Sequence, residues 1–346
     1  MQYYLGKHQF TCGVDLHGRN LYLCVLDRDG EKLLHRRIDC NPRKLLAALE
    51  PYREDLIIGV ECMFKWYWLA DFCAEHGIRF VLGHALDMRA VHGAKSGNDR
   101  LDAERIARLL LGGLFPCAFV YPPEMRSTRD LMRRRGYHVR RRSDLLQHIQ
   151  IKGLQANLAP FGKISDHTRR EGLLELFDDP AVHCSVEADL SLIDLYDSII
   201  QRLEKKILAA ARVHDHHAFS LLKSVNGIGD IIALSVLYEI HSIRRFKEVG
   251  NFLSYSCLIK GSKTSDGKPK GYGGSKRGNL HLKNAFSEAA VHFLRGNTKG
   301  QALHSRLVKK HGKQKALSVL AAKIGRAVFF MLHRNTPFDL DLFVRA

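Results

Sequence analysis

FTCGVDL, at residues 10–16, is an apolar run that predicts a β-strand, and Asp15 lies near its end. The apolar run LIIGVE, at residues 56–61, predicts a second strand and ends in Glu61. An acid at the end of a strand is often only a turn residue, so neither position indicates a function by itself. Together they place two carboxylates at the ends of buried strands.

A pair of acids follows at the start of a predicted helix. Asp99 and Asp102 lie in NDRLDA, at residues 98–103, and their spacing of three puts both on one helix face. The strand-end acids and this pair can therefore converge on one point. Four carboxylates cannot all stay ionised close together unless a cation joins them, and Mg²⁺ is the natural candidate because it prefers oxygen ligands. The alternative is that the pair only caps the helix or interacts with its dipole.

The order of predicted elements is that of an RNase H-like fold. Turn signals separate three short strands, and Pro42 and Gly77 mark a helix start and a helix end. The predicted elements are strands 10–16, 20–26 and 31–38, helix 42–49, strand 55–61, helix 65–76, strand 78–83, a polar loop through Gly97, and helix 99–111. In such a fold, acids from the first strand, the fourth strand and a later helix meet at one metal site. We therefore expect an α/β catalytic domain at residues 8–120.

The composition points to a polyanionic partner. The chain of 346 residues has a net charge of +18, and nucleic acid is the commonest intracellular polyanion. No apolar run approaches about 18 residues, so no membrane span is expected, and the N-terminus is not a signal peptide. The eight cysteines form no C-x-x-C pair, which argues against a zinc knuckle or a disulfide framework. Free thiols in a reducing cytoplasm are the simplest interpretation.

Residues 121–215 predict a helical or coiled-coil region whose first helix, at about 123–159, is strongly basic. Eight arginines fall within 17 residues, with Asp130 the only acid among them, so local neutralisation is poor. We favour a phosphate-tracking surface over a solvated helix face. Its expected contacts are Arg126, Arg129, Arg133, Arg134, Arg140 and Arg141.

Two further features of this region follow from its sequence. Gly136 is expected to interrupt the arginine-rich helix, and residues 160–184 are expected to form a loop-rich connection. Apolar residues then recur at three-four spacing from Leu192 to Ala210, which predicts an amphipathic helix. That helix pairs either with the arginine-rich helix or with a second protomer.

Residues 216–340 predict a helical domain with two candidate phosphate contacts. A helix, a tight Gly-x-Gly turn and a second helix form a helix-hairpin-helix pattern, in which Gly227 and Gly229 expose backbone N–H groups to a phosphate. The same turn also occurs in plain helical corners. The glycine-rich segment 260–283 has seven Lys/Arg and one acid, so it either approaches phosphates or is only a basic loop. Its candidate contacts are Lys268, Lys270, Lys276 and Arg277. Helices are expected at 280–294 and 313–333.

These motifs, in this order, give the chain a resemblance to a known family. It resembles the insertion-sequence transposases with a DEDD acidic tetrad, whose relatives include the pilin-gene DNA invertases and the bridge-RNA-guided serine recombinases. The residues that carry the resemblance are GVD at 13–15, GVE at 59–61, WYWL at 66–69, NDRLDA at 98–103, VNGIG at 225–229, RFK at 245–247, YSCL at 255–258 and SKRGN at 275–279.

The resemblance implies a RuvC-like N-terminal domain, a central helical linker and a C-terminal transposase domain. Its metal ligands for Mg²⁺ would be Asp15, Glu61, Asp99 and Asp102. It also implies a catalytic serine about ten residues after a Tyr-x-x-Leu stretch, which is Ser265 when counted from Tyr255. Because Asp266 follows that serine where the family usually has glycine, Ser262 stays an alternative, and Ser275 belongs to the next basic motif.

By this resemblance the protein is a site-specific DNA recombinase. The serine would attack a scissile phosphate and form a covalent protein–DNA bond, which a DNA hydroxyl later reverses. A structured non-coding bridge RNA would select donor and target DNA, and homodimers would assemble to a tetramer at synapsis. The expected location is the bacterial cytoplasm, in association with the nucleoid. The rival predictions are a metal-only nuclease resembling Holliday-junction resolvases, without a covalent intermediate, and a non-catalytic nucleic-acid-binding protein.

Overall fold

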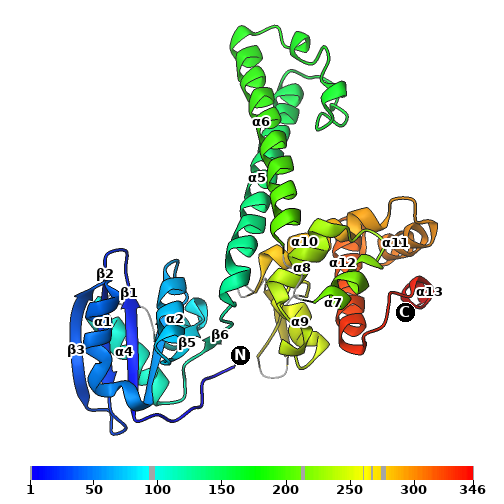
Figure 1. The fold of residues 1–346 in the computed structure, drawn as a ribbon. Coiled ribbons are helices and arrows are strands. Elements are labelled where there is room, and N and C mark those ends of the chain that lie inside the picture. The colour runs from blue at the N-terminus through cyan, green and yellow to red at the C-terminus, as the bar shows by residue number, and fades with distance from the viewer. Residues whose placement is uncertain are drawn as a thin grey trace. The chain divides into compact units, whose positions relative to one another are not determined.

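The chain consists of two compact units, Met1–Pro123 and Glu124–Ala346. The computed structural model describes residues 2–92, 98–211, 215–259, 261–265, 268–273 and 278–345, with the backbone alone for 89–92, 169, 261–265 and 268–273. The first unit is mixed α/β and the second is mainly helical (Figure 1). The finer division into three domains stays a prediction.

Unit Met1–Pro123 is built on a six-stranded mixed sheet with the order β3-β2-β1-β4-β5-β6. β1 pairs antiparallel with β2 and parallel with β4, which pairs parallel with β5. The elements are β1 (Phe10–Leu16), β2 (Asn20–Leu26), β3 (Lys32–Asp39), α1 (Pro42–Leu49), η1 (Glu50–Asp55), β4 (Leu56–Glu61), α2 (Trp66–Glu75), β5 (Arg79–Gly83), α3 (Ala85–His92), α4 (Asp99–Leu111) and β6 (Cys117–Ala118). The predicted succession of strands and helices up to β5, and the helix at α4, are confirmed.

The polar loop predicted after β5 is wrong for residues 85–92, which form α3. The physical reason is tertiary packing. Met88 of this helix is buried and contacts an apolar cluster that includes Ile106, Leu110 and Phe115. A helix of only two turns is marginally stable by itself and gains its stability from such tertiary contacts.

α1 and α2 cover one face of the sheet. Alternate side chains of the central strands, such as Val14 and Val60, point to this face and are fully buried. They contact Leu45 of α1 and Leu69 of α2 in a single apolar cluster. The alternation that predicted the strands is therefore the pattern that builds this core.

α4 lies on the opposite face, directly against the backbone of β1. A Cβ atom on Gly13 would lie 2.1 Å from the carbonyl oxygen of Ala103 and 2.4 Å from the backbone nitrogen of Ala107. Gly59 is the partner of Gly13 in the parallel register. A Cβ atom on Gly59 would lie 2.6 Å from the side-chain atom Cδ1 of Leu110 in α4. Only glycine permits so close an approach between a helix and a strand.

Unit Glu124–Ala346 begins with two long helices, α5 (Pro123–Gln155) and α6 (Pro180–Ala210), which run antiparallel. Three ion pairs fix their register: Arg135–Glu204 at 2.7 Å, Arg142–Asp197 at 2.5 Å and His148–Asp189 at 2.5 Å. The predicted interruption at Gly136 is wrong, because α5 continues through it. The predicted loop at 160–184 holds η2 (His167–Arg169) and η3 (Leu174–Leu176) and overlaps the start of α6.

The rest of this unit is a helical bundle with one β-hairpin. Its elements are α7 (His216–Lys223), α8 (Asp230–Ile240), η4 (Ile243–Arg245), α9 (Val249–Tyr255), β7 (Gly261–Ser265), β8 (Lys268–Gly273), α10 (Leu280–Phe293), α11 (Thr298–His311), α12 (Lys313–Arg334) and α13 (Leu340–Arg345). Phe252, Phe286 and Phe293 are fully buried in its core. Among the described helices, α12 alone is long and apolar enough to cross a membrane, but half of its apolar stretch is buried inside the bundle.

The close packing of α4 on β1 gives a direct test. We expect Gly13→Ala to lower the free energy of unfolding of unit Met1–Pro123 by about 2 kcal/mol, because the added methyl group would collide with helix backbone. Both tryptophans of the chain, Trp66 and Trp68, lie in α2, so urea unfolding followed by tryptophan fluorescence reports on this unit.

Gly18→Ala is the matched control. No heavy atom lies within 4 Å of a Cβ built at Gly18, so the stability should change by less than about 0.5 kcal/mol. Equal stabilities of the two variants would show that α4 does not rest on β1.

Candidate functional site

Asp15 and Glu61 lie side by side at the ends of two central strands. β1 and β4 are parallel, with Val14 opposite Val60, so the next residues along each strand are Asp15 and Glu61. Neighbouring strands are about 5 Å apart. Because alternate residues share a face, Asp15 points to the same side as Gly13, which is the side that α4 covers.

Asp99 and Asp102 occupy the first turn of α4. Asn98 caps this helix, since its side chain accepts a hydrogen bond from the Arg100 backbone N–H at 3.1 Å. Asp102 also accepts a hydrogen bond from Arg105 at 2.9 Å. The helix runs back along β1 from this end, so its acidic first turn lies at the edge of the sheet where β1 ends.

His17 connects the acids of the strand and the helix. Its Nε2 lies 2.9 Å from Asp15 Oδ2 and 3.3 Å from Asp99 Oδ1. Burial raises the pKa of Asp15, the hydrogen bond and charge of His17 lower it, and the charges of Asp99 and Asp102 raise it, with a net increase. Burial lowers the pKa of His17, but Asp15 and Asp99 raise it above its usual value. Such shifts are typical of carboxylates held close together.

The sequence pattern did not single out His17, which directly follows β1. A signal was present, because residue 17 follows Asp15 by two and therefore shares its face of the strand. One ligand atom each from Asp15, His17 and Asp99 lie within 4.8 Å of one another.

The donor atoms of this cluster fit a divalent cation. The carboxylates of Asp15 and Asp99 supply the oxygen ligands that hard cations prefer, and the imidazole nitrogen of His17 lies beside them. The structure brings Asp15, His17, Asp99 and Asp102 together and puts Glu61 beside Asp15. Burial is the main cause of the raised pKa of Asp15, and a cation among these residues would offset the smaller contribution from the charges of Asp99 and Asp102.

The predicted phosphate surface on α5 needs correction at its N-terminal end. Arg126 and Arg129 are only 6% and 7% exposed, so neither lies on an open surface. Arg129 donates to Glu239 of α8 at 2.9 Å, and Arg133 donates to the same carboxylate at 2.7 and 2.8 Å. The sequence around α5 does not reveal this neutralisation of the arginines, because Glu239 is 110 residues from Arg129 along the chain.

The remaining predicted arginines of α5 are exposed. Arg134 and Arg141 stack on Tyr137, with guanidinium carbons 4.6 and 5.2 Å from the ring centroid. Arg141 also lies 3.4 Å from Asp144. Within the described part of the chain, Arg134 and Arg140 have no acidic partner within 4.0 Å. These three side chains remain available for a polyanion.

The predicted helix-hairpin-helix turn joins α7 to α8. Gly227 has φ +91°, and a Cβ there would lie 2.4 Å from the backbone nitrogen of Phe293, so this glycine is required for packing on α10. Gly229 is the N-cap of α8 and faces open space. The phosphate contacts predicted for the backbone N–H groups of both glycines stay predictions.

The basic segment folds as the hairpin of β7 and β8, with Ser265 opposite Lys268 at its tip. Lys268 and Lys270 lie in β8, where the backbone alone is described. Lys276 and Arg277, like Ser275, lie outside the described residues. The roles predicted for these side chains stay predictions.

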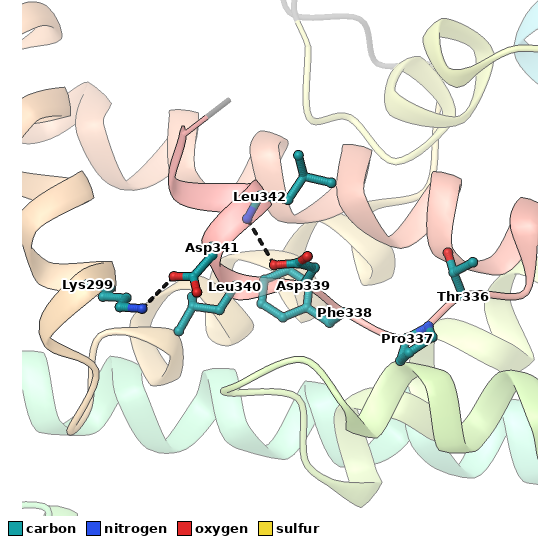
Figure 2. Close-up of a pocket in the computed structure, with 8 residues that line it drawn as sticks. All are labelled: Lys299, Thr336, Pro337, Phe338, Asp339, Leu340, Asp341 and Leu342. Atoms are coloured by element: carbon teal, nitrogen blue, oxygen red, sulfur yellow. Dashed lines mark hydrogen bonds and ion pairs between the residues drawn. The ribbon is translucent and has the colours of Figure 1, made fainter.

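A hollow of about 660 Å³ lies beside α13 in the second unit. Figure 2 shows that its charged side chains form an ion pair or accept a backbone hydrogen bond. Lys299 pairs with Asp341, and Asp339 accepts a hydrogen bond from the backbone N–H of Leu342 at 2.9 Å. We assign it no function.

Comparison with known proteins gives consistent matches along the chain. Residues 12–153 match a family model described as a transposase of the DEDD, IS110 type. Residues 219–305 match one described as "Transposase IS116/IS110/IS902 family". A curated relative, the transposase for insertion sequence element IS1111A of Coxiella burnetii (strain RSA 493 / Nine Mile phase I), is 22% identical over 343 residues, which cover 94% of this chain and 90% of that protein.

The buried Glu239 predicts a pH-dependent contribution to stability. Burial by itself would raise the pKa of Glu239, but Arg133 and Arg129 lower it from 4.5 to about 2. The ionised carboxylate therefore stabilises the fold above pH 4.5, and this contribution is lost as the pH falls toward 2. We expect Glu239→Gln to lower the free energy of unfolding by roughly 3 kcal/mol at neutral pH, and the difference to shrink below about pH 4.5.

Urea unfolding followed by far-UV circular dichroism measures this effect, with tryptophan fluorescence reporting the first unit as an internal reference. Glu187→Gln, at an exposed position on α6, is the control and should have little effect at any pH. A Glu239→Gln defect that did not depend on pH would contradict the assignment of the low pKa.

Proposed function

Since the chain is a DEDD transposase of the IS110 family, we propose that it cuts and rejoins DNA with Ser265 as nucleophile, at a Mg²⁺ site formed by Asp15, Glu61, Asp99 and Asp102. The observation that carries this proposal is the convergence of acids from β1, β4 and α4 at one end of the sheet. The strand order and the place of these acids support an RNase H-like, RuvC-like first domain.

The acids would hold the metal, and His17 would help to orient Asp15 and Asp99. Mg²⁺ bound there supplies charge stabilisation at a scissile phosphate. The Ser265 oxygen forms a bond to phosphorus while the bond from phosphorus to one DNA oxygen breaks, and the serine proton is transferred to that oxygen, which leaves as a hydroxyl. Because a phosphodiester-like bond is kept, a DNA hydroxyl reverses the step without an external energy source.

Ser265 is preferred to Ser262 for a reason of geometry. Both residues lie in β7, but Ser265 pairs with Lys268 at the tip of the hairpin, and Ser262 pairs with Tyr272 nearer its base. The acids and the serine belong to different units of the chain. A nucleophile at a hairpin tip can reach a site on another unit or another subunit more easily than one at the base.

The proposal includes an RNA partner and an oligomer. Donor and target DNA would be selected by a structured non-coding RNA, and both polymers present phosphates to the exposed Arg134, Arg140 and Arg141. The exposed apolar side chains of Leu192, Leu195 and Leu208 on α6 support a dimer seam along this helix. Two dimers would form the synaptic tetramer.

The nucleophile is tested by trapping. We expect Ser265→Ala and Asp15→Asn each to reduce the covalent protein–DNA adduct by about 1,000-fold or more, since one removes the attacking oxygen and the other a metal ligand. The adduct is measured on denaturing gels with DNA that carries the ends of the element, together with the RNA transcribed from the flanking DNA.

Ser262→Ala is the matched control and should retain the adduct. If Ser262→Ala were the only serine variant to lose the adduct, Ser262 would be identified as the nucleophile. Strand cleavage that persists in Ser265→Ala without any adduct would favour the metal-only nuclease. Ser265→Ala and Ser262→Ala should both bind DNA with unchanged affinity, because neither substitution removes a charged phosphate contact.

The exposed arginines give a second test. We expect Arg140→Ala to weaken nucleic-acid binding and to reduce the slope of log K against log salt by about one, the value for one lost phosphate contact. Arg202→Ala, at an exposed position on α6, removes the same charge elsewhere and should leave the slope unchanged. Equal slopes for Arg140→Ala and Arg202→Ala would show that the salt dependence follows the net charge and does not report a phosphate contact at Arg140.

A further inference from the structure

The chain segments before and after the β7–β8 hairpin are joined by a hydrogen bond between the end of α9 and the start of α10. The backbone N–H of Asn279 donates to the carbonyl oxygen of Tyr255 at 2.6 Å. Gly278, with φ +137°, fits against this junction, since a Cβ there would lie 2.5 Å from Cys257 Sγ and 2.8 Å from the same carbonyl oxygen. The end of α9 and the start of α10, which precede and follow the hairpin in the chain, are therefore held together.

Asn279 uses its side chain in two directions from this point. Its Oδ1 caps α10 by accepting from the backbone N–H groups of His281 and Leu282 at 2.9 and 3.1 Å. These two donors settle the orientation of the amide, which directs Nδ2 to Glu239 Oε2 at 2.7 Å. Asn279 is buried, so the bond to Glu239 is shielded from water.

Capping alone does not require this second contact. Serine and aspartate cap helices as well as asparagine does, and neither has an amide donor. The hydrogen bond from Asn279 Nδ2 to Glu239 is therefore not needed to begin α10, and a different role is expected for it. Glu239 is held in place by Arg129 and Arg133 of α5, so the junction of α9 and α10 is tied through one carboxylate to the long helix.

We propose that Asn279 and Glu239 are positioning residues that hold the two segments flanking the hairpin and thereby restrict the direction in which its tip carries Ser265. A two-stranded ribbon is marginally stable in isolation, so its orientation depends on what holds its base. The role of the tip in catalysis rests on the function proposed above, but the tether itself does not.

Asn279→Ser tests the tether, because serine keeps the cap and loses the amide donor. We expect amide hydrogen exchange in β7 and β8 to accelerate about tenfold or more, while exchange in α12 stays unchanged. We expect the rate constant for adduct formation at saturating DNA to fall by about tenfold, with an unchanged dissociation constant for DNA, because geometry rather than binding is altered.

Asn297→Ser is a closely matched control. Asn297 caps α11 by accepting from the Gly300 backbone N–H at 2.9 Å, and within the described chain its Nδ2 has no hydrogen-bond partner. The same substitution there should change neither the exchange in the hairpin nor the adduct rate.

Two results would overturn the proposal. One is unchanged exchange in β7 and β8 of Asn279→Ser, and the other is equal acceleration in α12, which would reveal a general loss of stability. The exchange measurement does not depend on the identity of the nucleophile. Retention of the adduct by Ser265→Ala would therefore refute the proposed chemistry and leave the tether to be judged by exchange alone.

Discussion

The contact between the backbone of α4 and the backbone of β1 at Gly13 is the constraint on which the candidate site depends. With any larger residue at this position the helix would have to move outward, because its own carbonyl and amide groups already lie where a Cβ would be. The acids of β1 and α4 are 84 residues apart in the chain, and this contact sets their spacing. On the neighbouring strand, Gly59 leaves room for the side chain of Leu110, so α4 also packs closely on β4.

The second unit depends on an electrostatic contact of a different kind. A buried carboxylate such as Glu239 is costly unless charged donors surround it, and Arg129 and Arg133 supply them. Two guanidinium groups around one carboxylate leave excess positive charge on α5. The long helix is thus anchored by part of its arginines, and the exposed remainder keeps its charge for a polyanion. The same residues cannot serve both purposes, which explains why burial divides the arginine run.

Much of the first unit could be predicted from the sequence, because its signals are local. Alternation of apolar residues identified β1 and β4, and Pro42 and Gly77 marked helix ends. The predictions that were wrong have a common cause. α3 is stabilised by the burial of Met88, and Arg129 by an acid on another helix; neither contact leaves a local pattern. His17 was missed because a histidine within a turn-like segment carries no periodic signal, although its two-residue offset from Asp15 defined its side of the strand.

The two parts of the proposed chemistry make opposite demands on the chain. A metal site needs ligands held rigidly, and a sheet covered by packed helices provides this. A nucleophile that first attacks DNA and later releases it must approach and withdraw, which a narrow hairpin permits. Such a hairpin is useful only if its motion is restricted to one direction, since a freely moving serine would lose the advantage of proximity. A rigid base with a projecting tip satisfies both demands. This is why the hydrogen bonds of Asn279, at the junction of α9 and α10, would matter to the reaction proposed for the hairpin tip.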